Sequence, residues 1–154
     1  LEEIKSEWVS MAKYKYTHEV PLKPGALRFL KHLKEQGIPM GIATSNGWDL
    51  VNEVLDVLKI REYFQVIATA CEVAAGKPAP DVYLYVAGQL GVKPERCMVF
   101  EDVPAGIRSG KAAGMTVCGV EDDYSAHIDK EKRMLADYFI ESFDQLFEEE
   151  KPNG

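Results

Sequence analysis

Short apolar segments alternate along this chain with segments of helical periodicity, and this alternation constrains the fold more than any other feature of the sequence. We expect strands at 38–44, 64–70, 97–100, 115–120 and 138–140. These segments are apolar throughout and rich in Val, Ile and Ala, which is typical of strands buried on both faces of a parallel sheet. The sequence therefore predicts an α/β fold in which a doubly wound parallel sheet carries helices on both faces.

The segments between the strands have apolar residues three and four positions apart, which indicates helices. Gly37 suits the end of one helix, and Asp81 suits the first turn of another, where a carboxylate interacts favourably with the helix dipole. Residues 13–22 show no clear period and are interpreted as a connector. The predicted helices are 1–12, 26–37, 48–58, 81–90, 105–113, 126–135 and 142–149.

Length and charge exclude several classes of partner. The chain has 154 residues, enough for one domain with a core, and a net charge of −7. We expect no nucleic-acid partner and no anionic membrane surface, because the sequence offers no basic stripe to neutralise phosphates. No apolar run approaches the ~18 residues of a membrane-spanning helix, and the first residues do not resemble a signal peptide. We therefore expect a cytoplasmic protein.

The cysteines and histidines give little indication of chemistry. The three cysteines are widely spaced and form no CxxC pair, so we expect buried, reduced thiols. The three histidines are scattered over the connector and two helices, and we assign them no catalytic role. These residues are Cys71, Cys97, Cys118, His18, His32 and His127.

Two adjacent acids, Glu101 and Asp102, follow the apolar run 98–100. In open α/β sheets ligands bind beyond the carboxyl ends of the strands, which is where these acids fall. Neighbouring carboxylates repel each other unless a cation lies between them, and oxygen ligands of this kind suit Mg²⁺. The alternative is a solvated acidic turn.

Two further loops are expected at the same edge of the sheet, because right-handed crossovers place all the strand carboxyl ends together. Thr44, Ser45 and Asn46 close one predicted strand and open a helix, and their N–H groups with the Thr44 hydroxyl suit a phosphate. Lys77 lies between a glycine and a proline, where a fixed ammonium would balance phosphate charge. The alternatives are an ordinary helix N-cap and a surface lysine.

Three motifs together resemble a known family. IATSN at 42–46, GKPAPD at 76–81 and VFEDVPAGIRSGKAAGM at 99–115 are similar to the second, third and fourth motifs of the haloacid dehalogenase-like hydrolase superfamily. The resemblance extends from about Leu22 to Ile140 and is strongest to the helical-cap branch that includes β-phosphoglucomutase and phosphoglycolate phosphatase. It implies a Rossmann-like core at 21–150, with the C-terminal end of the helical cap and a connector at 1–20.

The resemblance also implies roles for individual residues. Thr44 would bind the transferring phosphoryl group through its hydroxyl, with Ser45 and Asn46 adding contacts. Lys77 would neutralise the phosphoryl group and the nucleophile. Asp102, with Glu101, would help to hold Mg²⁺.

One motif of the family is not found in these 154 residues. The first motif is a strand ending in Asp-x-Asp, whose first Asp is the nucleophile and whose second is the general acid/base. In the family this strand lies between the strands that here end at Thr44 and at Glu101. We expect that a preceding N-terminal segment, or another chain, supplies it, and that residues 1–154 alone are inactive.

The resulting hypothesis is a Mg²⁺-dependent phosphatase that acts on a small phosphate monoester, such as a sugar phosphate, through an aspartyl-phosphate formed on an upstream Asp. Its partners would be a small phosphorylated metabolite and the missing N-terminal segment. Two alternatives stay open. One is a β-phosphoglucomutase-like phosphomutase, and the other is a non-catalytic phosphate- or metal-binding module that has lost its nucleophile.

Overall fold

The fold is described from a computed structural model, and the structure describes residues 25–69, 72–121 and 127–148. The predicted helix at 1–12, the connector at 13–22 and the proposed cap remnant at 1–20 lie outside these ranges. So do Cys71 and His18.

Strands and helices alternate along the described residues, as predicted. The strands are β1 (Gly41–Ala43), β2 (Val66–Ala68), β3 (Met98–Glu101), β4 (Thr116–Val120) and β5 (Tyr138–Ile140). The α-helices are α1 (Ala26–Glu35), α2 (Trp48–Leu58), α3 (Asp81–Leu90), α4 (Pro104–Ala112), α5 (Asp129–Leu135) and α6 (Asp144–Glu148). Two short 3₁₀ turns, η2 (Arg61–Tyr63) and η4 (Pro94–Arg96), precede β2 and β3.

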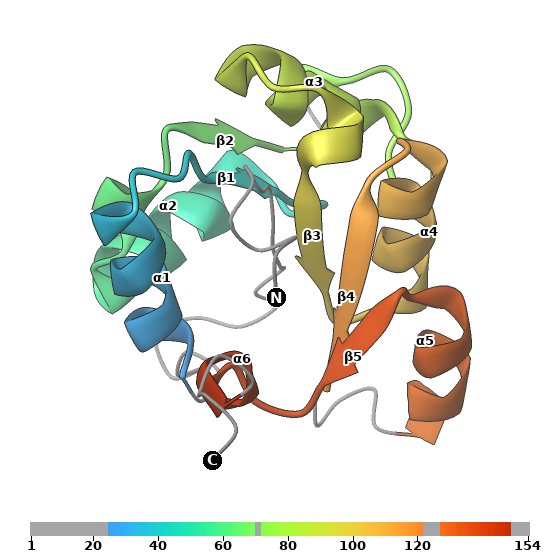
Figure 1. Cartoon of the computed structure of the whole chain (residues 1–154). Helices are drawn as coiled ribbons and strands as arrows, with labels where there is room; N and C mark the ends of the chain where they lie inside the picture. Colours follow the sequence, from blue (N-terminus) through green and yellow to red (C-terminus); the bar gives the residue numbers. More distant parts are fainter. Residues whose placement is uncertain (1–24, 70–71, 122–126, 149–154) are drawn as a thin grey trace.

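The strands are parallel and form two separate hydrogen-bonded groups within the described residues (Figure 1). β1 pairs with β2, with Ile42 opposite Ile67. β3, β4 and β5 form a second group, in which β4 is central and Phe100 lies opposite Cys118. Among the described residues, β1 and β3 therefore each have a ladder partner on one side only.

Helices cover both faces of these strands, which confirms the predicted doubly wound α/β class. Successive residues of a strand point to opposite faces, and β3 shows this directly. Met98 and Phe100 pack in a core with residues of α1, α2 and α6, whereas Val99 packs in a second core with residues of α3 and α4. Cys97 and Cys118 are buried, one in each core, as predicted.

The strands predicted at 38–44 and 64–70 are shorter in the structure, and the strand predicted at 115–120 begins one residue later. The segment before β1 is tied to the end of α1, because the Ile38 N–H donates to the Leu33 carbonyl at 3.0 Å. The Met40 N–H donates to the Gln65 side-chain oxygen at 2.7 Å, so the hydrogen-bond ladder between β1 and β2 begins only at Gly41. The bounds predicted for the helices at 48–58 and 81–90 and for the strand at 138–140 are confirmed.

The helices of the described residues do not have the length and apolarity that crossing a membrane requires.

Candidate active site

The Lys77 ammonium joins two strand ends that belong to different hydrogen-bonded groups. It donates to the Ala43 carbonyl at the end of β1, at 3.2 Å, and it forms a short ion pair with the Glu101 carboxylate at the end of β3. The two side chains of this pair are only 5% and 0% exposed. The alternative of a solvated surface lysine is therefore wrong.

The Glu101 carboxylate is enclosed by four groups. Besides Lys77, the Tyr83 hydroxyl of α3 donates to Oε2 at 2.6 Å, and the Asp102 N–H donates to Oε1 at 3.2 Å. Gly106 of α4 closes the remaining side, because a Cβ at this position would overlap the carboxylate. The alternative of a solvated acidic turn is thus also wrong, since Glu101 and Asp102 are 1% and 7% exposed.

Tyr83 is a functional contact that the sequence analysis missed. Its side chain is completely buried, and burial, together with the charge of the Glu101 carboxylate, raises the pKa of Tyr83 well above its usual value. Tyr83 therefore stays protonated at neutral pH and donates to the carboxylate. No sequence signal identified it, because an aromatic residue within an apolar helix is usually a packing residue.

Asp102 presents the carboxylate best suited to a divalent cation. Carboxylate oxygens are the hard ligands that Mg²⁺ prefers, so the donor type fits. The oxygens of Glu101 are already engaged by Lys77, Tyr83 and the Asp102 N–H. Within the residues that the structure describes, no group of three or more acidic, histidine or cysteine side chains is arranged to hold a metal ion. Asp102 fits as one ligand, and a complete shell would need further oxygens.

Thr44 is buried at the end of β1. Its N–H donates to the Ala68 carbonyl of β2 at 3.0 Å, and its Oγ1 accepts from the Asn46 N–H at 3.1 Å. A hydroxyl that accepts one bond still carries a proton to donate. The N-cap of α2 is Gly47, without a side-chain hydrogen bond, so the alternative of an ordinary N-cap is wrong for Thr44, Ser45 and Asn46.

The structure brings Thr44, Lys77, Glu101 and Asp102 to one edge of the sheet, because Lys77 contacts Ala43 beside Thr44 and Glu101 beside Asp102. Ser45 is exposed, and among the described residues the structure gives it no contact with Lys77 or the two acids. Asn46 is half-buried and adjoins the site through its bond to Thr44.

A further carboxylate at this edge, Glu72 in the loop after β2, was also not predicted from the sequence. It accepts from the Trp48 indole N–H at 2.8 Å and from the Thr69 hydroxyl and N–H at 2.8 and 2.5 Å. Burial pushes the pKa of Glu72 upward, but the bonds from Thr69 and Trp48 outweigh it and the pKa is lowered. Glu72 thus orients the Trp48 ring at the start of α2.

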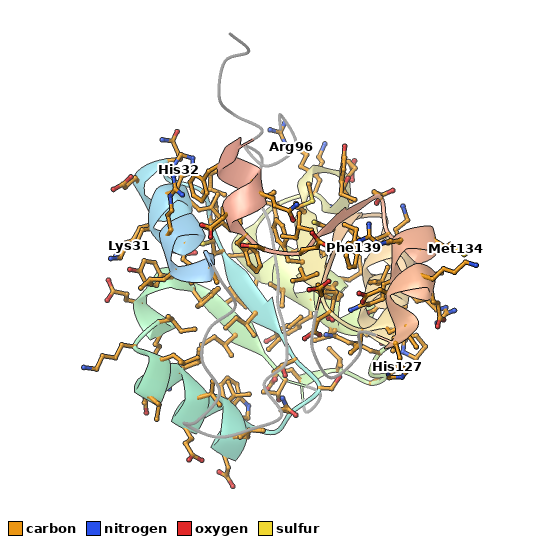
Figure 2. All side chains as sticks on the ribbon, turned by 90° about the horizontal axis from the view of Figure 1, so that it is seen from below. Lys31, His32, Arg96, His127, Met134 and Phe139 are labelled. Carbon is orange, nitrogen blue, oxygen red and sulfur yellow. The ribbon has the colours of Figure 1, made fainter. Side chains whose placement is uncertain are left out.

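Two histidines lie in the described residues, and they are far apart. Figure 2 shows His32, on α1, and His127, just before α5, on opposite sides of the molecule.

The fold and the site define a class of α/β protein, with a buried lysine–carboxylate pair and an adjacent aspartate at the carboxyl edge of a parallel sheet. The chain belongs to the haloacid dehalogenase-like hydrolases, whose family model matches residues 5–114. This confirms the family inferred from the three motifs.

Curated relatives cover much of this chain. A probable pseudouridine-5'-phosphatase from Drosophila melanogaster is 39% identical over an alignment 135 residues long, which covers 79% of this chain and 58% of that protein. Hexitol phosphatase A from Escherichia coli is 36% identical over 138 residues, which are 90% of this chain and 62% of that protein. The chain thus spans about three fifths of the length of these two relatives.

Solved structures show the same fold. CbbY from Rhodobacter sphaeroides, in complex with xylulose-(1,5)bisphosphate, superposes with a TM-score of 0.76 at 33% identity and covers 83% of this chain, which spans 57% of that one. β-Phosphoglucomutase from Clostridium difficile superposes with a TM-score of 0.70 at 30% identity and covers 86% of this chain, which spans 55% of that one.

Proposed function

We propose that this protein is a Mg²⁺-dependent phosphatase that hydrolyses a small phosphate monoester, such as a sugar phosphate. The observation that carries the proposal is the buried pair of Lys77 and Glu101, with Asp102 and Thr44 beside it at one sheet edge. A buried cation next to a buried acid pair suits a ligand that brings several negative charges and a metal with it.

Two side chains bind the phosphoryl group in this proposal. The Lys77 ammonium has three protons, and its bonds to Ala43 and Glu101 leave one to donate to a phosphoryl oxygen. The Thr44 hydroxyl donates to a second phosphoryl oxygen. Ser45 and Asn46 add contacts from the loop that opens α2.

Asp102 is the principal metal ligand of this chain, with Glu101 as a second. Mg²⁺, when bound, offsets negative charge on the phosphoryl oxygens. Because Lys77 and Tyr83 already engage Glu101, Asp102 would be the main ligand of the two.

The nucleophile is an aspartate outside these 154 residues, as the family resemblance implies. Its carboxylate oxygen attacks phosphorus, the bond from phosphorus to the ester oxygen breaks, and the leaving alcohol takes a proton from the second Asp of Asp-x-Asp, a proton that the attacking water later returns. Water then attacks the aspartyl-phosphate, which releases inorganic phosphate and restores the carboxylate. The sequence contains no Asp-x-Asp, and the single-sided pairing of β1 and β3 within the described residues supports a strand between them.

Relatives indicate the substrate class. These relatives include a probable pseudouridine-5'-phosphatase and a hexitol phosphatase, and the CbbY structure holds xylulose-(1,5)bisphosphate. These ligands share a phosphate ester on a small polyhydroxylated carbon skeleton. We propose the same class for this protein.

A phosphomutase is the second candidate, and the structural similarity to β-phosphoglucomutase supports it. The chemistry would be the same, but a sugar hydroxyl would accept the phosphoryl group in place of water. The third candidate is a phosphate- or metal-binding module without catalysis.

The test is an assay of the full-length protein with a panel of sugar and polyol phosphates, with Mg²⁺ or with EDTA. Free phosphate that appears only with Mg²⁺, and not with Asp102→Asn, supports the phosphatase. An isomeric sugar phosphate without free phosphate identifies the mutase. A protein that binds phosphate or metal but forms neither product would support the third candidate, the binding module. Lys34→Ala, which removes an exposed ion pair with Glu62, is the matched control.

A further inference from the structure

Lys132 of α5 is a fully buried cation outside the motifs that define the site. Its side chain is 0% exposed, and its ammonium donates to the carbonyls of Asp102 and Val120, each at 3.1 Å. It also forms an ion pair with Asp129, one turn earlier in the helix, at 3.1 Å. The ammonium thus donates two hydrogen bonds, to the carbonyls, and the Asp129 carboxylate balances its charge.

Burial makes this arrangement costly. Removing an ammonium and a carboxylate from water costs several kcal/mol per ion, and apolar residues of similar size are often as stable as a buried pair. Stability alone therefore does not account for a lysine here. Its two carbonyl partners follow β3 and end β4, so the ammonium fixes the two strand ends relative to each other.

We infer that Lys132 is a positioning residue: it holds the Asp102 backbone so that the Asp102 carboxylate is preorganised for a divalent cation. The inference rests on the proposed role of Asp102 as the metal ligand. Asp102 is held from two sides, by Lys132 at its carbonyl and by its own N–H bond to the Glu101 carboxylate. A ligand whose backbone is fixed on both sides loses little freedom when it binds the ion.

A charge effect would act in the opposite direction. Removing the positive charge of Lys132 would by itself raise the affinity for a nearby cation, whereas loss of positioning would lower it. The double variant Lys132→Met/Asp129→Asn separates the two effects. It removes one positive and one negative charge, so the net charge is unchanged, and Asn keeps a polar side chain in the first turn of α5.

The experiment measures Mn²⁺ binding to the full-length protein by electron paramagnetic resonance of the free ion. We expect affinity in Lys132→Met/Asp129→Asn to fall by about 10- to 100-fold, the usual loss when a group that orients a metal ligand is removed. The single variant Lys132→Met should also bind Mn²⁺ more weakly than wild type. Unchanged Mn²⁺ affinity in a folded double variant would overturn the inference.

A second readout needs no metal. Hydrogen exchange in the metal-free protein should become faster at residues 102–107 in the double variant, because the Asp102 backbone is released. Leu33→Ala is the control for lost stability, since Leu33 is fully buried near the end of α1, at the opposite edge of the sheet. That variant should unfold more easily but keep its Mn²⁺ affinity.

The two readouts distinguish this inference from the proposed function. A wild-type protein that binds no Mn²⁺ would refute the metal site. Hydrogen exchange at residues 102–107 that is the same in wild type and in the double variant would then refute the positioning role as well. A wild-type protein that binds Mn²⁺ and needs it for phosphate release would support the proposed function whatever Lys132 does.

Discussion

Lys77 and Glu101, which are 24 residues apart in the sequence, form an ion pair with side chains that are 5% and 0% exposed. Lys77 lies in the loop before α3 and Glu101 ends β3, and the bond from Lys77 to the Ala43 carbonyl links this pair to the end of β1. Breaking a buried ion pair on one side leaves an uncompensated charge, whereas neutralising both sides is often tolerated. This asymmetry makes the contributions of the pair to stability and to activity separable.

Lys77→Met should destabilise the protein by about 3–5 kcal/mol, because the Glu101 carboxylate stays buried without its cation. The double variant Lys77→Met/Glu101→Gln should recover much of that loss in denaturant titrations. Phosphatase activity of the full-length protein should fall at least about tenfold in both variants, equivalent to ~1.4 kcal/mol in the barrier. Recovered activity in the double variant would show that the lysine serves stability alone.

Tyr83→Phe should cost about 1.5–3 kcal/mol of unfolding free energy, the range for a hydrogen bond to a charged group. The hydroxyl of Tyr83 donates to Glu101 at 2.6 Å, and both side chains are buried. Tyr85→Phe is the control on the same helix, because Tyr85 is 37% exposed. Its effect should stay within about 0.5 kcal/mol, as for most surface substitutions. Equal effects of the two variants in urea titrations would argue against the Glu101 contact.

The sequence predicted the site to the extent that topology determines it. Parallel strands with right-handed crossovers place their carboxyl ends together. The sequence alone was therefore enough to predict that Lys77 and the acid pair lie at one edge of the sheet. That the pair would be buried did not follow from residue type, since a lysine in a loop and two adjacent acids are usually solvated. Their burial depends on Tyr83 and Gly106, which pack over Glu101.

The contacts that the sequence could not predict are those between distant elements. Lys132 belongs to a predicted helix with many charged residues, and no local pattern distinguishes it from its exposed neighbours. Its burial follows from how α5 packs against α4 and β5, which depends on the whole fold. Figure 2 shows Met134, two residues later, pointing outward from the same helix, and it is 78% exposed.

The low pKa of Glu72 makes a testable contribution to acid stability. A carboxyl whose pKa is lower in the folded state binds more protons when unfolded, so its stabilisation is present above the unfolded pKa. It is lost as the pH falls through the folded pKa, below the ordinary value of 4.5. Glu72→Gln should therefore have a lower melting temperature than wild type at pH 7. The difference in melting temperature between the two proteins should become smaller as the pH approaches 3.

The control for this prediction is Glu35→Gln, which changes an exposed carboxylate at the end of α1. Melting curves of the three proteins between pH 7 and pH 3 provide the comparison. If the difference in melting temperature between wild type and Glu72→Gln grew toward acid pH, the Trp48 and Thr69 hydrogen bonds would not favour the ionised form of Glu72.

Gly106 and Gly88 provide a matched pair of helical glycines with opposite expected outcomes. Alanine is preferred to glycine within a helix by about 0.5–1 kcal/mol when there is room for the methyl group. Gly88 of α3 has open space where its Cβ would lie, so Gly88→Ala should raise the melting temperature slightly.

At Gly106 the same methyl group would overlap the Glu101 carboxylate and displace it from Lys77. Gly106→Ala should therefore lower both stability and phosphatase activity, with calorimetry and phosphate release as the measurements. If Gly106→Ala behaved like Gly88→Ala in both assays, the Glu101 carboxylate would not occupy the enclosed position that the proposed site requires.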